Sequence, residues 1–440
     1  MQASMTSDTA YRRIPVFGGF NASLEEKYDS TQTGRLLRVG LKMNTPPTCN
    51  WRCPYCYVGD PDAAKRPLQE TVRDHDGIPL HRDPTWTARM KGWLLQAIDL
   101  GVQAVTLNGT FEPTAAKDWK DVILFLQDRG VAVSLVTNGG LLDEADLQWI
   151  AGSGINLLTK LNVPIVELDD PRLPELERIQ GFMAGINRPA KEVYAGQVAF
   201  IERLAELGMA DLRPDGTTRL GVESVIARIN LPYLPELISQ LRARNIYAHV
   251  ELTKAQGYAQ QNPELAIDRE DVARLFEVVR QQDIAEGYQP YEAKPPYLAG
   301  ACYENLFRVD IHADGTIKPC PGIETPIGDL NESSLAEIIR SPALEIIRNL
   351  PTTVQGDCKD CELLANRSCL AGCRGTAYQA MANAGRGEYE RWTASDPSCW
   401  RVEKVLDDGT LAKDVFDVAM SRAEIADRRQ PIALPFPTVR

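Results

Sequence analysis

The chain lacks several features that would fix its location or partners directly. Its 440 residues contain no run of about 18 apolar residues, so we expect no membrane-spanning helix. The N-terminal stretch MQASMTSDTAYRR has no apolar segment of a signal peptide, and we therefore expect a cytoplasmic protein. Lys and Arg are outnumbered by Asp and Glu, and the formal net charge of −12 argues against general binding of a nucleic-acid backbone.

Cysteine is missing from the whole middle of the chain. The ten cysteines fall into two groups, with none between Cys56 and Cys302. Buried cysteines acting as small hydrophobic residues would be scattered through the strands and helices instead. In a cytoplasmic protein we expect metal or redox use, because disulfides are rare there. The early group is Cys49, Cys53 and Cys56, and the late group is Cys302, Cys320, Cys358, Cys361, Cys369, Cys373 and Cys399.

The cysteine-free segment alternates between short apolar runs and amphipathic stretches. Strands are predicted at residues 38–43, 102–107, 131–137, 155–162, 218–230 and 246–253. Helices are predicted at residues 83–101, 115–130, 143–154, 190–208, 234–245 and 268–283. Six strand–helix units indicate an α/β fold with a parallel sheet, and they favour a partial (β/α)6 TIM-like barrel over a complete eightfold one. We expect the active site at the carboxyl ends of the strands, where the early cysteines lie.

Three close cysteines suit two kinds of site. One is zinc with three protein ligands and a water. The other is a four-iron four-sulfur cluster with one iron left without a protein ligand, since thiolates suit iron–sulfur clusters. The stiffening Pro54 and the flat rings of Tyr55 and Tyr57 beside the cysteines favour the cluster.

The early group resembles the signature of the radical S-adenosylmethionine superfamily. It has the spacing Cys49-x3-Cys53-x2-Cys56, with the aromatic Tyr55 just before the last cysteine. The resemblance implies a cluster whose open iron is chelated by S-adenosylmethionine. It further implies reductive cleavage to a 5′-deoxyadenosyl radical that abstracts a substrate hydrogen, with a flavodoxin- or ferredoxin-type protein as reductant.

The resemblance also places S-adenosylmethionine contacts at the strand ends. Gly109 and Glu112 in NGTFEPT would hold the methionine ammonium, and Asn138 in VTNGG would meet the ribose or carboxylate. A cation or amide further along could pair with the carboxylate; the candidates are Lys160, Asn162, Arg228 and Asn230. Ordinary turn chemistry is the competing interpretation of all these positions.

The late group resembles the SPASM extension of the same superfamily, with one spacing slightly longer than usual. This implies two auxiliary four-iron four-sulfur clusters, and hence three clusters in all. The nearer one would be held by Cys302, Cys320 and Cys373, with Asp310, His312, a water or the substrate completing it, and the outer one by Cys358, Cys361, Cys369 and Cys399. A zinc-stabilised binding protein is the rival, with a four-cysteine ribbon of Cys358, Cys361, Cys369 and Cys373.

These assignments divide the chain into four parts. They are an N-terminal extension (1–34), the barrel (35–300), the auxiliary-cluster domain (301–400), and a C-terminal helix and tail (401–440). Within the third part, FRVDIH, ADG and TIKP predict a hairpin. Ser334 and Glu337 have the spacing of a capping box at a helix start.

Net oxidation is the predicted reaction. Every cysteine is assigned to a cluster, so no thiol remains to quench a radical as a sugar epimerase would require. Only 48 residues precede Cys49, fewer than an independent leader-binding domain needs, so a maturase of ribosomal peptides would require a separate binding protein. We therefore predict an oxidoreductase of natural-product biosynthesis that dehydrogenates an alcohol carbon of a small polar, sugar- or aminocyclitol-like metabolite. This resembles the radical dehydrogenases of aminoglycoside pathways. A peptide maturase forming a cross-link or thioether, and a sugar epimerase, remain alternatives.

Such an oxidation needs a base, which would take a proton while one electron passes to the nearer auxiliary cluster. Candidates lie in AHVELTKAQG at the end of the sixth strand, namely His249, Glu251 and Lys254, and Asp310 and Glu223 are further ones. Salt bridges and a satisfied buried histidine are the competing interpretations.

The two groups of cysteines predict different losses on substitution. Cys53→Ala should abolish cleavage of S-adenosylmethionine, because the early cluster cannot form with two thiolates. Cys399→Ala should mainly damage the outer auxiliary cluster. Iron content and 5′-deoxyadenosine release after anaerobic reconstitution measure both effects. Normal cleavage by Cys53→Ala would show that the early loop has another role.

Overall fold

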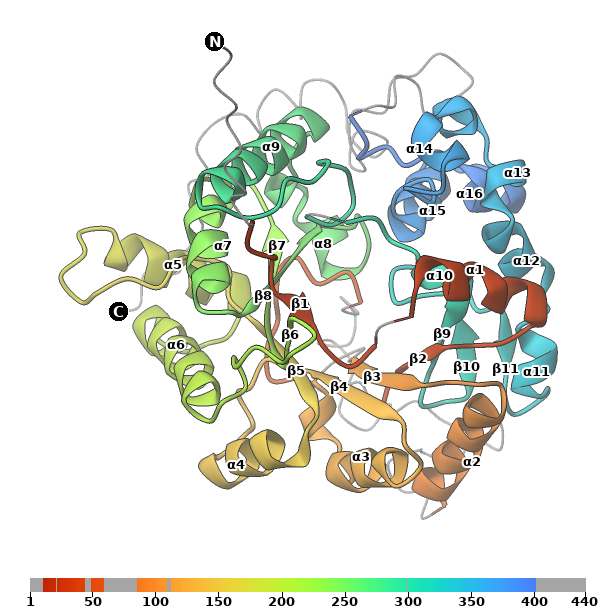
Figure 1. The fold of residues 1–440 in the computed structure, drawn as a ribbon, viewed down its shortest axis with the longest axis horizontal. Helices are drawn as coiled ribbons and strands as arrows, with labels where there is room; N and C mark the ends of the chain where they lie inside the picture. Colours follow the sequence, from red (N-terminus) through yellow and green to blue (C-terminus); the bar gives the residue numbers. More distant parts are fainter. Residues whose placement is uncertain are drawn as a thin grey trace, which may run out of the picture.

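The six predicted strands form the wall of a partial barrel (Figure 1). The computed structural model describes residues 11–20, 22–43, 49–58, 85–108, 112–298 and 300–400. In this part of the chain, one nine-stranded sheet has the order β11-β10-β9-β2-β3-β4-β5-β7-β8. Its parallel core comprises β2 (Arg38–Leu41), β3 (Ala104–Asn108), β4 (Ala132–Val136), β5 (Asn156–Lys160), β7 (Leu220–Ile226) and β8 (Tyr247–Leu252). The predicted α/β partial barrel is confirmed.

The predicted helices surround the sheet (Figure 1). They are α2 (Trp86–Asp99), α3 (Trp119–Gln127), α4 (Glu144–Ser153), α6 (Ala190–Glu206), α7 (Leu234–Ala243) and α9 (Arg269–Ala285). Buried side chains such as Leu94, Ile123 and Leu204 share one apolar core with the outward side chains of the strands. That core holds the helices against the outside of the barrel.

Between β2 and β8, one α-helix that the structure describes was missed from the sequence. It is α5 (Leu173–Ala184), which lies between β5 and α6 and packs against α6. Its apolar residues Leu176, Ile179 and Met183 are buried at helical spacing, so the signal was present in the sequence. The short α8 (Gly257–Gln261) follows β8.

The inner face of the barrel is polar. Successive side chains of a strand point to opposite faces, so every second residue faces inward. Outward residues such as Val105, Leu135 and Val222 are buried in the helix-covered core. The inward residues line a central cavity and include Arg38, Thr106, Asn108, Ser134, Lys160, Glu223, His249 and Glu251. This partial barrel therefore encloses a charged cavity where a closed eightfold barrel has packed side chains.

The segment before the barrel packs on both halves of the molecule. β1 (Val16–Phe17) pairs in parallel with β6 (Thr217–Thr218), next to the barrel. α1 (Leu24–Thr33) lies beside α10 (Glu304–Phe307) (Figure 1). Phe20 lies in the chain between β1 and α1, and its ring stacks on that of Phe307 in α10 with 5.1 Å between the ring centroids. The described residues between Val16 and Thr33 thus pack against the main fold.

The predicted hairpin after the barrel exists and does more than was expected. β9 (Arg308–Ile311) and β10 (Thr316–Lys318) pair antiparallel, and β11 (Gly328–Asp329) adds to β10. β9 also pairs in parallel with β2, so the hairpin extends the barrel sheet past its first strand. The sequence of a hairpin does not indicate which distant strand it will pair with, so the pairing of β9 with β2 was not predicted.

Short helices complete the C-terminal part. α11 (Leu335–Ile338) begins at Ser334, whose side chain forms the predicted capping box with Glu337. The helices α12 (Pro342–Arg348), α13 (Leu350–Thr353), α14 (Glu362–Ala365), α15 (Arg374–Asn383) and α16 (Glu388–Thr393) follow. The predicted C-terminal helix and tail lie outside the described residues, and the predicted domain boundaries stay predictions. None of the helices that the structure describes is long and apolar enough to cross a membrane.

Candidate active site

The cysteines gather at two places. The central cavity, of about 460 Å³, is lined by Cys49, Cys53, Cys56, Cys302, Cys320 and Cys373. A smaller pocket is lined by Cys358, Cys361, Cys369 and Cys399. All ten thiols are free of disulfides. The late cysteines are thus divided as the SPASM resemblance implies, and the zinc-ribbon set is split, because Cys373 lies apart from its three proposed partners.

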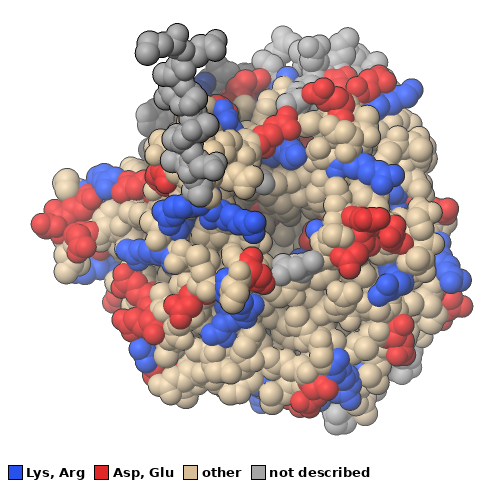
Figure 2. All heavy atoms as spheres, viewed as in Figure 1, with Lys and Arg blue, Asp and Glu red and all other residues tan. Residues whose placement is uncertain are grey.

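The face of the molecule seen in Figure 1 is drawn with all heavy atoms in Figure 2. In the space-filling view this face is hollowed near its middle, between the barrel and the C-terminal elements (Figure 2). Acidic and basic side chains are interspersed around the hollow (Figure 2).

The early cysteine loop is held by two helices. At the end of α5, the backbone N–H of Arg52 donates to the Ala184 carbonyl over 3.1 Å. At the start of α8, the Tyr258 N–H donates to the Cys56 carbonyl over 2.9 Å. These backbone contacts position the loop so that its three thiols lie on the cavity wall.

The early thiols suit a metal cluster. Burial raises the pKa of the Cys49 thiol to about 11, and burial also raises the pKa of Cys53. A buried thiolate is costly unless a cation compensates its charge, and iron bound by the thiolates supplies that charge. The three residues therefore fit the group that the sequence predicts for them.

Three of the predicted S-adenosylmethionine contacts at the strand ends line the cavity, namely Glu112, Asn138 and Lys160. Tyr55 of the cysteine signature, a further expected cofactor contact, lines it as well. Glu112 is buried, and burial raises its pKa. Its carboxyl accepts hydrogen bonds from the Thr137 hydroxyl over 2.6 Å and the Asn138 N–H over 2.8 Å. The Asn138 amide in turn donates to the Asn50 side chain over 2.8 Å, beside Cys49. The strand-end residues thus connect the β3 and β4 loops to the cysteine loop.

Three predicted contacts are not brought to the cavity, and a fourth, Gly109, lies outside the described residues. The Asn230 amide is fully buried and donates to the carbonyls of Asn162 and Val225, over 3.1 and 3.0 Å. The Asn162 side chain accepts from the Val225 N–H over 3.2 Å. These two amides fasten the loops after β5 and β7 to each other. Arg228 is likewise absent from the cavity lining.

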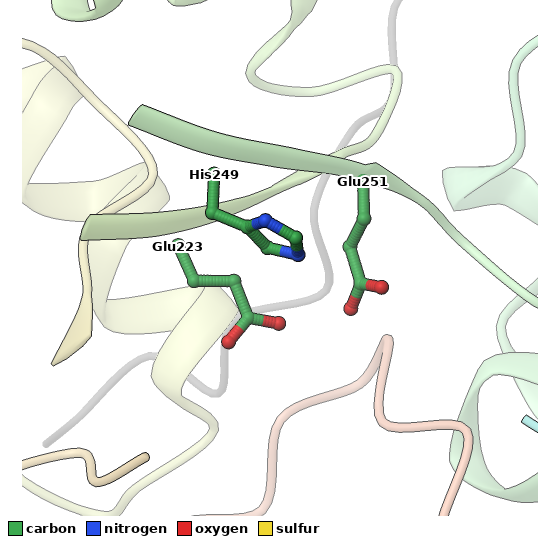
Figure 3. Close-up of side chains that lie close together, drawn as sticks. All are labelled: Glu223, His249 and Glu251. Atoms are coloured by element: carbon green, nitrogen blue, oxygen red, sulfur yellow. The ribbon is translucent and has the colours of Figure 1, made fainter. Parts of the chain in front are cut away.

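The candidate bases do converge. Glu223 on β7 and His249 and Glu251 on β8 point toward one another inside the cavity (Figure 3). One ligand atom of each lies within 4.8 Å of the others. Lys160 forms an ion pair with Glu223, and Lys254 with Glu251 over 3.0 Å. Sequence reasoning ranked Glu223 low, although in GVESVI it is the charged residue of an otherwise apolar run and therefore a candidate for the inner face.

Burial separates the protonation states of these groups. Burial raises the pKa of Glu223 to about 7, in spite of the nearby Lys160 ammonium. Burial acts in the same sense on Glu251, but Lys254 and a hydrogen bond from Glu223 outweigh it and lower the pKa of Glu251. Burial lowers the pKa of His249 to about 4, so the ring is neutral near pH 7. Glu223 is therefore the member of the pair that gains or loses a proton near neutral pH, while Glu251 stays ionised.

Asp310 is not part of this group. Its side chain is fully buried and is absent from the cavity lining. It pairs with Arg308 over 2.8 Å and Lys42 over 3.5 Å. Neither Asp310 nor His312 lines the cavity beside Cys302 and Cys320. The reason is that β9 joins the sheet, which places Asp310 against Gly40 of β2.

Comparisons with known proteins agree with this architecture. Residues 302–362 match the model of the SPASM iron–sulfur cluster-binding domain. The chain is 28% identical to the PqqA peptide cyclase of Rhizobium meliloti (strain 1021), across 80% of this chain and 84% of that protein. It is 27% identical to the PqqA peptide cyclase of Rhodopseudomonas palustris, across 80% and 84%.

Solved structures share the fold. Streptococcus suis SuiB bound to the precursor peptide SuiA is similar with a TM-score of 0.57 and 16% identity, over 88% of this chain and 84% of that one. The structure of anSMEcpe with bound AdoMet is similar with a TM-score of 0.54 and 14% identity, over 78% and 90%. The chain is a radical S-adenosylmethionine enzyme with a C-terminal SPASM domain. This enzyme uses S-adenosylmethionine and four-iron four-sulfur clusters.

The contact between α5 and the cysteine loop gives a test of preorganisation. Gly185 ends α5 with a φ of +62°, and a Cβ there would meet the backbone carbonyl of Arg52. Gly185→Ala should therefore displace the early cysteine loop and lower both its iron content and the cleavage of S-adenosylmethionine severalfold.

Gly216→Ala is the matched control. Gly216 has a φ of +81° with open space around its Cβ position, so it shares only the backbone strain of about 1–2 kcal/mol. Iron analysis, electron paramagnetic resonance of the reduced clusters and 5′-deoxyadenosine release compare the two variants. Equal behaviour would mean that α5 does not position the loop.

Proposed function

We propose that this radical S-adenosylmethionine enzyme modifies a peptide by joining two of its side chains. The observation that carries the proposal is the similarity to four proteins named PqqA peptide cyclase, each aligned over about four-fifths of this chain. The predicted small polar substrate and the dehydrogenation of a sugar alcohol receive no support from these relatives. The peptide maturase, held open above as an alternative, is the better-supported reading.

The residues of the cavity are suited to such a reaction. Bound together, the early cluster and S-adenosylmethionine supply a carbon radical that removes a hydrogen atom from a substrate. We assign Cys49, Cys53 and Cys56 as the ligands of that cluster. Lys160, Glu112 and Asn138 line the same cavity and are proposed to orient S-adenosylmethionine.

The size of the cavity favours local entry of a peptide. The cavity of about 460 Å³ would also have to hold S-adenosylmethionine and the clusters, so it leaves room for a short segment of a peptide and none for a folded body. The wall includes the rings of Tyr57, Tyr247 and Tyr297, beside charged groups. We propose that a short peptide segment enters and is held between these aromatic and charged surfaces.

The second set of thiols supports an oxidative outcome. Cys302, Cys320 and Cys373 line the same cavity as the early thiols. We propose that they bind an auxiliary cluster that accepts an electron. Cys358, Cys361, Cys369 and Cys399 would bind an outer cluster, for three in all. A flavodoxin- or ferredoxin-type reductant is proposed to supply the early cluster. The proposed reaction is therefore still a net oxidation, and its product is a cross-linked peptide, not the ketone that dehydrogenation of an alcohol carbon would give.

Mass spectrometry tests the proposal. The anaerobically reconstituted enzyme is incubated with S-adenosylmethionine, a reductant and the PqqA peptide, and in parallel with a panel of sugars and aminocyclitols. We expect the peptide to lose the mass of two hydrogens, with deuterium from labelled side chains appearing in 5′-deoxyadenosine. Cys53→Ala is the inactive control. Loss of two hydrogens from a sugar, with no change in the peptide, would restore the dehydrogenase interpretation.

A further inference from the structure

A row of charged side chains crosses the cavity between its two sets of thiols. We propose that the carboxyl pair of Glu223 and Glu251 in this row accepts the proton that the substrate releases during the oxidative step. The inference rests on the proposed function, because it assigns a role within that reaction. It goes further by naming the group that receives the proton.

Strand register brings the two carboxyls together. Glu223 of β7 lies opposite His249 of β8, and Glu251 lies opposite Val225, two residues further along each strand. All three side chains point inward from two adjacent parallel strands (Figure 3). Diagonal neighbours on one face of a sheet are within reach of long side chains, so the carboxyls of Glu223 and Glu251 meet.

Two lysines extend the pair toward the thiols on either side. Lys160 of β5 binds Glu223, and the thiol of Cys53 is close enough to act on the charge of Lys160. Lys254 binds Glu251, and the thiol of Cys373 acts on its charge. The Lys254 ammonium also lies 4.2 Å from the centre of the Tyr57 ring, next to Cys56. The row Lys160–Glu223–Glu251–Lys254 therefore spans the space between the proposed radical site and the proposed electron acceptor.

The other titratable groups that face the carboxyl pair do not exchange protons near neutral pH, so the pair is the group of the cavity that can. The His249 ring is neutral, and the Tyr247 hydroxyl lies 3.2 Å from its Nδ1. Tyr57 and Tyr297 face the pair from the cysteine loop and from the segment before Cys302, and burial raises the pKa of both. Two adjacent buried carboxyls cannot both ionise without mutual repulsion, whereas one of them can gain or lose a proton while the lysines remain charged.

A metal ion is the other occupant that Glu223, His249 and Glu251 could suggest. Each carboxyl, however, already binds an ammonium group, which supplies the positive charge that a cation would bring. Lys254 is buried and Lys160 is half-buried beside its partner, so binding a metal would require displacing two paired charges. The cluster is better suited to moving a proton than to holding an ion.

The balance of the proposed reaction requires such an acceptor. Joining two substrate positions, R–H and R′–H, forms one R–R′ bond and removes two hydrogens. One leaves as a hydrogen atom to the 5′-deoxyadenosyl group. The other leaves as a proton and an electron: the proton goes to Glu223 in its ionised form, and the electron would pass to the iron–sulfur cluster that Cys302, Cys320 and Cys373 would hold. The pair then returns the proton to solvent.

Amide substitutions test this role, since they keep the shape of the side chain and remove its acidity. Glu223→Gln and Glu251→Gln are compared with Asp283→Asn, which removes a buried carboxylate paired with Arg242 away from the cavity. With the PqqA peptide as probe, we expect iron content and 5′-deoxyadenosine release near wild type in all three. Cross-linked product per 5′-deoxyadenosine should fall about 100-fold in the two Gln variants, the usual range for loss of a general base, and stay unchanged in the control.

A substrate-free measurement separates this inference from the proposed function. Infrared titration of the reconstituted wild type should show a protonated carboxyl band that disappears as pH rises through neutrality, and Glu223→Gln should lack it. Unchanged product per 5′-deoxyadenosine in both Gln variants, or joint loss of iron, cleavage and product, would overturn the assignment, as would a titrating band that survives in Glu223→Gln. A wild type inactive on the PqqA peptide would count against the proposed function alone, and the titration would still decide whether the pair holds an exchangeable proton.

Discussion

Parallel strands send every second side chain to the same face, and in this barrel that face is charged. Burying charge in a closed barrel interior would be prohibitive, because a buried ion without a partner loses its hydration. Two features make it possible here. The barrel is open on one side, so the inner face lines a cavity. The inward charges of β5 and β7 are paired across neighbouring strands, and Glu251 of β8 is paired with Lys254 just beyond the strand. The outward face bears the apolar core, which leaves the inner face free for chemistry.

The open side of the barrel determines how the C-terminal part attaches. Because β9 pairs with β2, the hairpin continues the sheet and carries Cys302 and Cys320, at its two ends, to the cavity wall. Asp396 then joins the two thiol sites: its carboxyl accepts the Cys373 N–H over 2.6 Å, and its own carbonyl accepts the Cys399 N–H over 3.1 Å. The cavity therefore receives thiols from segments far apart in the chain, held by the pairing of β9 with β2 and by the Asp396 carboxyl.

Features that depend on neighbouring residues in the chain could be predicted from the sequence, and features that depend on distant residues could not. The six strands and their helices were found because apolar runs and helix stops are local patterns, and the division of the late cysteines followed from the family resemblance. The helix α5 was overlooked although Leu176, Ile179 and Met183 mark it. The pairing of β9 with β2 joins residues far apart in the chain, and nothing local records it. That one pairing also buries Asp310 behind Arg308 and Lys42, its ion-pair partners, which line the cavity while Asp310 itself does not.

Residue type alone misled at the strand ends for a related reason. An amide after a strand can orient a ligand or fasten a loop, and only its surroundings decide. Asn138 faces the cavity, whereas Asn162 and Asn230 bind backbone groups of each other's loops. The small substrate was inferred from the few residues before Cys49, but residues 16–33 are incorporated into the fold and say nothing about what enters the cavity. The chemistry of the cavity is more informative. An enzyme that withdraws an electron on one side of its substrate must also place the accompanying proton, and a row of paired charges between two sets of thiols meets that requirement without a further residue.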